Sequence, residues 1–135
     1  MIYHDRGAAS ELFAASQFAG RGYQVYFPAM TQSKSDFIAE VDGVLKKVQV
    51  KTGCRFNPKY PHLLQIRLGG CGRTRYSKGY FDLLVIVKGT RMWVIPTDVV
   101  DITQCSMSFA TENVSGRKLK VDLTQYEWRT QWPRL

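Results

Sequence analysis

Three polar residues at the ends of two predicted strands have the types and spacing suited to hydrolysis of a phosphodiester. Asp36 opens one strand, and Gln49 and Lys51 lie at the end of the next. Because strand side chains alternate between faces, Gln49 and Lys51 project from the same side. A hairpin turn at Asp42-Gly43 would bring this pair back beside Asp36. A carboxylate, an amide and an ammonium group would then share one small volume.

Such a group suits a hard metal ion acting on a phosphodiester. Mg²⁺ prefers oxygen ligands and keeps several waters, so one or two side chains and a substrate phosphate suffice, and we expect Mn²⁺ to substitute. Asp36 would supply the anionic ligand and Gln49 a carbonyl oxygen, with the main-chain carbonyl of Val50 nearby. Lys51 would hold the attacking water or stabilise charge on the phosphate. An ordinary solvated hairpin produces the same spacing, so the spacing alone leaves both interpretations open.

Length and charge limit the class of protein. A chain of 135 residues is predicted to form one domain, residues 1–135, and its 44% hydrophobic content indicates a folded protein. The formal net charge of +8 is typical of a domain that binds polyanions, of which nucleic acid is the commonest. No basic amphipathic helix with a broad apolar face stands out, so we expect no membrane partner.

Cysteine and histidine spacing argues against a zinc protein. The three cysteines form no CxxC pair, and His4 and His62 do not complete a zinc-ligand pattern. We therefore expect thiols in a reducing compartment. The N-terminal residues lack the apolar core of a signal peptide, and no apolar stretch reaches transmembrane length. These features predict a cytoplasmic protein of a bacterium, an organelle or a phage-infected cell.

Hydrophobic periodicity predicts one helix followed mainly by strands. Apolar residues recur at helical spacing over residues 5–20, and Gly20 and Gly22 provide a stop. Further strands are predicted at residues 23–27, 63–68, 81–87 and 92–95, with a short helical turn at 98–100. The polar segment from Ile102 onward is not assigned, although Trp128 and Trp132 are expected to pack onto the core or a neighbouring subunit.

Glu11 adds a second acid to this constellation. It lies in the middle of the predicted helix beside apolar residues, where packing needs no carboxylate. A glutamate on a helix is usually solvated, so Glu11 alone indicates nothing. Together with Asp36, Gln49 and Lys51 it would complete an acidic centre shared by a helix, a strand and a hairpin.

Basic residues after the lysine strand would bind DNA. Arginines and lysines of this kind position the phosphate backbone, and some arginines read guanine. A flexible, charged connector explains the glycine-rich segment 69–79 equally well. The candidate residues are Arg55, Lys59, Arg67, Arg73, Arg75 and Lys78.

At these residues the chain resembles the PD-(D/E)XK nuclease superfamily. That family carries a glutamate in its first helix, an aspartate at the start of a strand and a (D/E)-x-K triplet on the next strand. The matching positions here are Glu11, Asp36 and the triplet Gln49-Val50-Lys51. The resemblance implies catalytic roles for Glu11, Asp36, Gln49 and Lys51. It also implies a metal held by Asp36, Gln49, Val50 and Glu11.

The resemblance also implies a fold and an assembly. The expected fold is α/β of mixed α+β type, with an αβββαβ core and a central mixed sheet flanked by helices. With glutamine in the triplet, the chain is most similar to the group I intron-encoded homing endonucleases of this superfamily. Those enzymes form tetramers of small subunits. Here Ser35 stands where a proline is usual, and Gln49 replaces an acid. The neutral glutamine should weaken metal binding, which substrate phosphates can partly offset.

Three functions follow from these residues. The leading hypothesis is a magnesium-dependent, sequence-specific endonuclease that cuts double-stranded DNA as a homing enzyme, acting as a homo-oligomer (dimer or tetramer) because both strands must be cut. A structure-selective nuclease such as a Holliday-junction resolvase has the same core and spacing. A DNA-binding module that has lost catalysis is a third possibility, motivated by Gln49.

Overall fold

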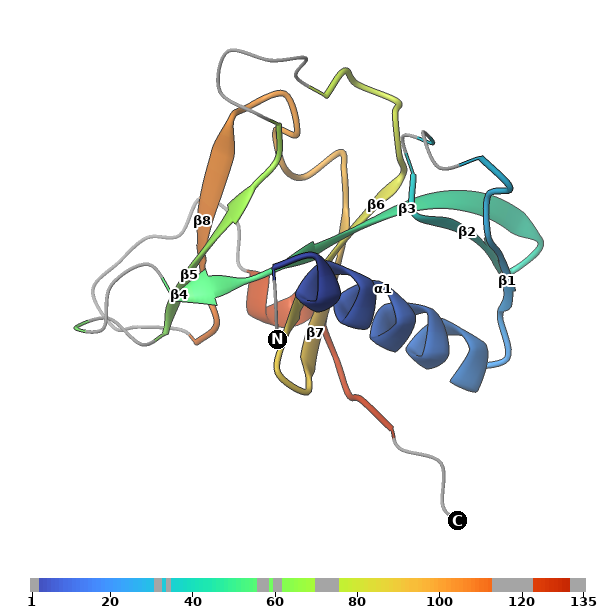
Figure 1. Ribbon diagram of the computed structural model, residues 1–135, viewed down its shortest axis with the longest axis horizontal. Coiled ribbons are helices and arrows are strands. Elements are labelled where there is room, and N and C mark those ends of the chain that lie inside the picture. Colours follow the sequence, from blue (N-terminus) through green and yellow to red (C-terminus); the bar gives the residue numbers. More distant parts are fainter. Residues whose placement is uncertain are drawn as a thin grey trace.

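In the part of the chain that the structure describes, one α-helix packs with two β-sheets (Figure 1). The computed structural model describes residues 3–30, 33, 35–55, 59, 62–69, 76–112 and 123–131, with the backbone alone for residues 3–5 and 55. The first half contains α1 (Tyr3–Gly20), β1 (Gln24–Tyr26), β2 (Phe37–Val41), β3 (Val44–Thr52), β4 (Cys54–Arg55) and β5 (Leu63–Arg67). The second half contains β6 (Leu83–Lys88), β7 (Arg91–Pro96), β8 (Ser106–Ala110), the 3₁₀ helix η1 (Leu123–Tyr126) and β9 (Glu127–Trp128).

The larger sheet is mixed. Its six strands lie in the order β1-β2-β3-β6-β7-β9, in which β3 and β6 run parallel and the other neighbours run antiparallel. The hairpin between β2 and β3 is the predicted one. It closes at Asp42 and Gly43, both with positive φ (51° and 80°), as a two-residue hairpin turn requires. The three strands of the smaller sheet, β4-β5-β8, are all antiparallel.

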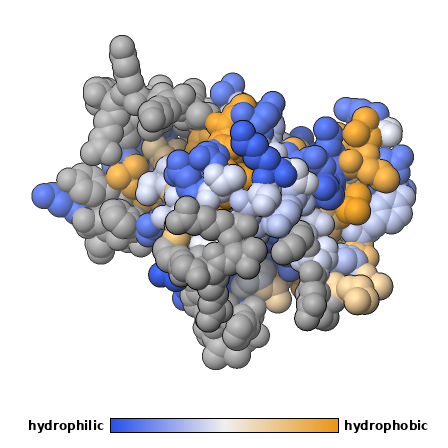
Figure 2. Space-filling model, turned by 90° about the horizontal axis from the view of Figure 1, so that it is seen from above, coloured by the Kyte–Doolittle hydropathy of each residue, from blue (hydrophilic) through white to orange (hydrophobic). Residues whose placement is uncertain are grey.

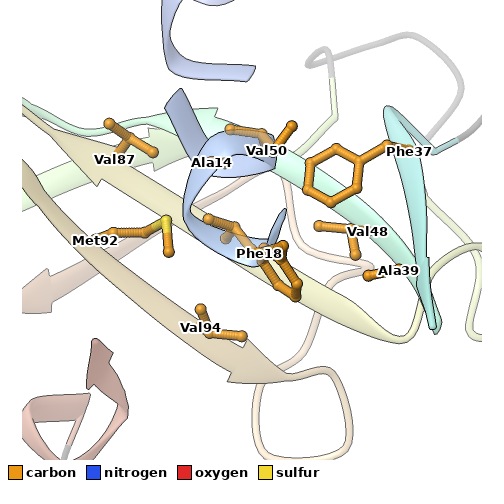
Figure 3. Packing of buried hydrophobic residues seen from close by; sticks show 11 residues of the cluster. Ala14, Phe18, Phe37, Ala39, Val48, Val50, Val87, Met92 and Val94 are labelled. Atoms are coloured by element: carbon orange, nitrogen blue, oxygen red, sulfur yellow. The ribbon is translucent and has the colours of Figure 1, made fainter. Parts of the chain in front are cut away.

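Helix α1 covers one face of the larger sheet through an apolar stripe. Ala14 and Phe18 are fully buried and pack against side chains of β2, β3, β6 and β7, as Figure 3 shows. The Phe18 ring makes an edge contact with Phe37, with centroids 5.4 Å apart. The helix begins at Tyr3, two residues earlier than predicted, and the chain turns away at Gly22, whose φ is +88°. This core holds α1 across the end of the sheet at which Asp36 lies.

The other face of the larger sheet is covered by strands, which corrects the prediction of flanking helices. Leu64 and Ile66 of β5 and Phe109 of β8 form a buried cluster with residues of β6 and β7 that include Leu84 and Trp93. In the described part of the chain α1 is the one α-helix, so the fold is α+β. The physical reason is the alternation of β5, which buries Leu64 and Ile66 as a helix would bury a stripe.

The chain passes from one sheet to the other at Gly53. This buried glycine donates its amide to the Val87 carbonyl at 2.9 Å. A Cβ at this position would come within 3.2 Å of Leu64 and 3.5 Å of Ile86. The close approach therefore lets β3 end in the larger sheet while β4 begins the smaller one directly after it.

The last described residues are tied back to the helix. The buried Gln17 amide forms two hydrogen bonds with the backbone of Gln131, at 2.9 and 2.8 Å. The Trp128 ring lies 4.6 Å from Phe18, which confirms that Trp128 packs onto the core. Arg91 binds Glu127 through two hydrogen bonds of 2.8 Å and so attaches the start of β9 to β7. Trp132 lies outside the described residues.

Smaller expectations have mixed outcomes. Residues 98–100 form a turn, closed by Val99 donating to the Pro96 carbonyl at 3.2 Å, and not a helical turn. Cys54 is a free, exposed thiol, whereas Cys105 is disulfide-bonded, so the expectation of a thiol is wrong there. Among the described residues, no helix has the length and apolar composition needed to span a membrane.

Removing the Phe18 ring tests this description of the core. Because Phe18 is fully buried among three aromatic rings, Phe18→Ala should lower the free energy of unfolding by about 3–5 kcal/mol, measured by urea denaturation. The matched control on the same helix is Leu12→Ala, whose side chain is 64% exposed and whose loss should change stability by less than about 0.5 kcal/mol. Equal effects of the two substitutions would contradict this packing.

Candidate active site

The Asp36 carboxylate lies where β2 and β3 separate. Phe37, the first residue of β2, pairs with Val48 of β3. Just before it, the Asp36 amide donates to the Val48 carbonyl at 2.8 Å. Beyond this point Val50 has no β2 residue opposite it, and its amide donates to Asp36 Oδ2 at 2.7 Å. The side chain thus replaces the missing strand as hydrogen-bond acceptor. The carboxylate position is therefore fixed by the backbone of β3.

Asp82 caps the opposite side of β3 in the same way. It precedes Leu83, which also pairs with Val48, and its Oδ2 accepts the Lys47 amide at 2.8 Å. Asp82 is therefore an acid with a structural partner. Asp36 differs because a cavity opens beside it.

Gln49 shares the same Asp36 oxygen. Its Nε2 donates to Asp36 Oδ2 at 3.0 Å, so that one carboxylate oxygen receives two N–H groups. The other oxygen, Oδ1, and the Gln49 carbonyl Oε1 remain as acceptors. The Val50 carbonyl points to the same edge of β3 as its amide, because both groups of a residue in a strand face the same neighbour. Three residues at this end of β3 therefore offer oxygens close to one another in the fold.

Glu11 approaches Asp36 from the helix side of the sheet. Both residues line a cavity of about 280 Å³, together with Phe27, Met30 and Ser35 among others. Burial raises the pKa of the Glu11 carboxyl, and the negative charge of Asp36 raises it further. Burial likewise raises the pKa of Asp36, against the opposing effects of the Val50 amide and the Lys51 ammonium. A carboxyl whose proton affinity is raised by a neighbouring carboxylate lies where a cation is favoured.

Lys51 extends from the other face of the sheet. Val48 and Val50 are buried beneath α1, so Gln49 and Lys51 face the opposite way, as the alternation predicted. Lys51 Nζ donates to the Tyr76 hydroxyl at 2.7 Å and lies 5.0 Å from the centroid of that ring. Tyr76 is in turn held by Phe81 at a centroid distance of 5.1 Å. The ammonium group is therefore oriented by a tyrosine that the sequence reading had not assigned to the site.

The oxygens of this site fit a divalent metal such as Mg²⁺. Two carboxylates, one amide carbonyl and one main-chain carbonyl are hard ligands of the type this ion prefers. In the described part of the chain, no group of three histidine, cysteine, aspartate or glutamate residues gathers at one place. The metal would therefore depend on the neutral oxygens of Gln49 and Val50 and on substrate phosphate, besides Asp36 and Glu11.

The predicted DNA-binding residues are distributed over several places. Arg67 is exposed and lines a cavity on the Lys51 side of the sheet. Lys78 lines a separate cavity bounded by residues 97–103, and Lys59 lies in an exposed turn. The Arg55 side chain and the whole of Arg73 and Arg75 lie outside the described residues. Of the three candidates whose side chains the structure describes, Arg67 is the one that lines a cavity with Lys51.

Sequence reasoning missed two further neighbours of Lys51. Arg6 of α1 lines the same cavity as Lys51 and Arg67. Ser10 shares a hydrogen bond of 2.7 Å with Thr52, which fixes the first turns of α1 against the end of β3. The sequence offered little to identify them, since it shows only that both residues lie within five positions of Glu11. The packing of α1 against β3 is what brings them close to the end of that strand.

A comparison with family models matches residues 1–130 to the one described as PD-(D/E)XK endonuclease. Protein 5.3 of Escherichia phage T7 is 43% identical over 97 residues, which cover 72% of this chain and 82% of that protein. The bacterial homing endonuclease I-Ssp6803I is similar in structure, with a TM-score of 0.72 over 93% of this chain and 86% of that chain. Its sequence identity of 20% means that this likeness concerns the fold.

The raised pKa values at the site predict how stability depends on pH. A carboxyl whose pKa is raised in the folded state binds its proton more tightly there than in the unfolded chain. Such a group destabilises the fold above its folded-state pKa, and the destabilisation disappears as pH falls through that value. Without metal, Asp36→Asn should therefore be more stable than the natural protein near neutral pH, and this difference should shrink in mildly acidic buffer.

Urea denaturation in EDTA at several pH values between neutral and mildly acidic measures this difference. The asparagine retains an oxygen that can accept the Val50 amide, so the hydrogen bond need not be lost. A stability difference that stays constant over this pH range would contradict the assignment.

Proposed function

Because the chain belongs to the PD-(D/E)XK endonuclease family, we propose that it is a divalent-metal-dependent endonuclease that cuts double-stranded DNA. The observation that carries the proposal is the arrangement around Asp36. One of its oxygens is held by Val50 and Gln49, while Glu11 and Lys51 approach from the two faces of the sheet.

The charge and the fold support the substrate and the type of enzyme. A net charge of +8 favours binding of a polyanion, and Arg67 lies beside Lys51. The likeness to a homing endonuclease supports a sequence-specific enzyme of homing type. Both cores share the larger sheet, which supports a single endonuclease domain over residues 1–135.

Each residue has a separate role in this proposal. Asp36, Glu11, Gln49 and the Val50 carbonyl would hold Mg²⁺ or Mn²⁺. When bound, the ion would supply Lewis-acid stabilisation of negative charge on the phosphate. Lys51 would donate a hydrogen bond to the attacking water or to a phosphate oxygen. Its ammonium group is held in place by a hydrogen bond to the Tyr76 hydroxyl. The Val50 amide and the Lys51 ammonium would favour the ionised form of Asp36, against the larger effect of burial, which raises its pKa.

Exposed apolar residues support a homo-oligomer. Figure 2 shows apolar surface (orange) at the end of the molecule formed by β1 and the β2–β3 hairpin. Tyr26, Phe27, Val44 and Leu45, which belong to this end, are 49–60% exposed. Apolar patches of this kind are typical of protein interfaces. A dimer or tetramer would provide one active site for each DNA strand.

Gln49 also favours a second function, a DNA-binding module without catalysis. The neutral amide removes one negative charge from the metal site, and its Nε2 group is hydrogen-bonded to Asp36. Binding of duplex DNA without cleavage in either Mg²⁺ or Mn²⁺ would support this function. Cleavage by the natural protein would exclude it.

Cleavage of a randomised duplex library in Mg²⁺ tests the proposed enzyme. We expect Lys51→Ala to bind duplex DNA with at most a few-fold loss of affinity but to cut at least about 100-fold more slowly, because the group that acts on the reacting phosphate is lost. Lys46→Ala is the matched control, since Lys46 lies on the same strand outside the site and should cut normally. Normal cutting by Lys51→Ala would show that the site is assigned wrongly.

Restoring an acid at position 49 tests the metal site. Gln49→Glu would replace the hydrogen bond to Asp36 by repulsion between two carboxylates. We therefore expect a lower Tm in EDTA but a larger increase of Tm on addition of Mg²⁺, with the midpoint of the Mg²⁺ titration about tenfold lower. A thermal melt with and without metal measures both effects. An unchanged response to Mg²⁺ would mean that residue 49 does not contact the ion.

A further inference from the structure

Two cavities, one lined by acidic and one by basic side chains, lie beside the candidate active site. Among the described residues, the first, of about 280 Å³, is lined by the acids Glu11 and Asp36 and by no basic side chain. The second, of about 350 Å³, is lined by Arg6, Lys51 and Arg67 and, within the same described part of the chain, by no acidic side chain. We propose that the second cavity binds a backbone phosphate of the DNA, next to the phosphate that is cut. This inference rests on the proposed function and adds a binding site to it.

Three separate elements build this basic cavity. Arg6 comes from the first turns of α1, Lys51 from the end of β3 and Arg67 from the end of β5. The elements are held together by the Ser10–Thr52 hydrogen bond between α1 and β3 and by the close approach of Leu64 to Gly53. The cationic groups therefore converge because of the fold and not because of their spacing in the sequence.

The two arginines are available for a ligand. Both side chains are exposed, and within the described residues neither forms an ion pair or a side-chain hydrogen bond. Arg91, by contrast, is fully engaged with Glu127. A guanidinium group matches two oxygens of a phosphate, and such charge-assisted bonds are the strong ones. An uncompensated pair of arginines beside Lys51 indicates that the missing partner is an anion.

The charge of the two cavities also orients the DNA strand. Lys51 lines the basic cavity, and its charge acts on Asp36, which lines the acidic cavity. A strand that passes across the end of β3 can place one phosphate between Arg6 and Arg67 and the next one at Lys51 and Asp36. The acidic cavity, with Phe27 and Met30 in its wall, would repel a phosphate unless a metal ion is bound.

Salt dependence of binding tests the phosphate site. We expect Arg6→Gln and Arg67→Gln each to weaken binding to a duplex of about 25 base pairs by about tenfold. Each should also reduce the slope of log K against log salt by about 0.9, the value for one lost phosphate contact. The measurement is made in EDTA, so that no cleavage occurs, and circular dichroism confirms that the exposed substitutions leave the fold intact.

A matched control removes the same charge elsewhere. Arg129 is exposed, and its backbone accepts a hydrogen bond from Arg21, just beyond the C-terminus of α1. Arg6 and Arg21 are 15 residues apart, or roughly 22 Å at the helical rise of 1.5 Å per residue. Arg129→Gln should therefore leave the slope almost unchanged. An equal change of slope in all three variants would overturn the proposal, since it would report net charge alone.

The free thiol of Cys54 gives an independent measurement. Cys54 is exposed and lines the same basic cavity. Saturating duplex DNA should slow the alkylation of Cys54 by iodoacetamide at least about fivefold, because the bound strand would cover the cavity. Peptide mapping identifies the alkylated cysteine. Unchanged alkylation at saturation would overturn the phosphate site.

Failure of this inference is distinguishable from failure of the proposed function. If the natural protein binds DNA with the predicted slopes and Cys54 protection but never cuts in Mg²⁺ or Mn²⁺, the phosphate site stands and the catalytic proposal falls. If it cuts, and Arg6→Gln and Arg67→Gln retain the natural slope, the catalytic proposal stands and the phosphate site falls.

Discussion

The hydrogen bond from the Val50 amide to the Asp36 carboxylate is the interaction on which the site depends. The amide of the buried Val50 needs an acceptor, and β2, which begins at Phe37 opposite Val48, does not extend far enough to provide one. An aspartate immediately before β2 satisfies this requirement and is thereby fixed to within hydrogen-bonding distance of β3. Asp82 meets the same requirement on the other side of β3. The fold would need an acceptor at position 36 even without catalysis, and the proposed active site would use the second oxygen of that acceptor.

This arrangement places a carboxylate where burial disfavours its charge. Burial raises the pKa of Asp36, and Glu11 raises the cost further when both are ionised. A third acid at position 49 would add more repulsion, whereas the Gln49 amide donates a hydrogen bond to the same oxygen. Compared with an acid at position 49, the glutamine therefore stabilises the metal-free protein but gives the metal site one negative charge less. Its presence is consistent with a site in which the substrate phosphate provides part of the metal coordination.

The sequence predicted the parts of the fold that local patterns determine. Alternation placed Gln49 and Lys51 on one face, and Asp42-Gly43 identified the hairpin that returns them to Asp36. The strand over residues 63–68 was predicted correctly, but the flanking helices implied by the family resemblance were wrong, because no local pattern shows that this strand and β8 cover the second face of the larger sheet. Arg6 and Tyr76 were missed for a related reason. Their positions beside Lys51 result from contacts between elements far apart in the chain.

Strand β3 connects these features, since it is central to the larger sheet, leads directly into β4 of the smaller sheet and contributes residues to both sides of the site. Its buried valines hold α1, and with α1 Glu11, on one face, while Lys51 projects from the other face toward β5. Two residues later Gly53 allows the chain to enter the smaller sheet without leaving contact with Ile86. A Cβ at Gly53 would come within 3.2 Å of Leu64, so that the Leu64 side chain would have to shift. The opposite charges of the two cavities are therefore a consequence of one strand that is central to the larger sheet and continues directly into the smaller one.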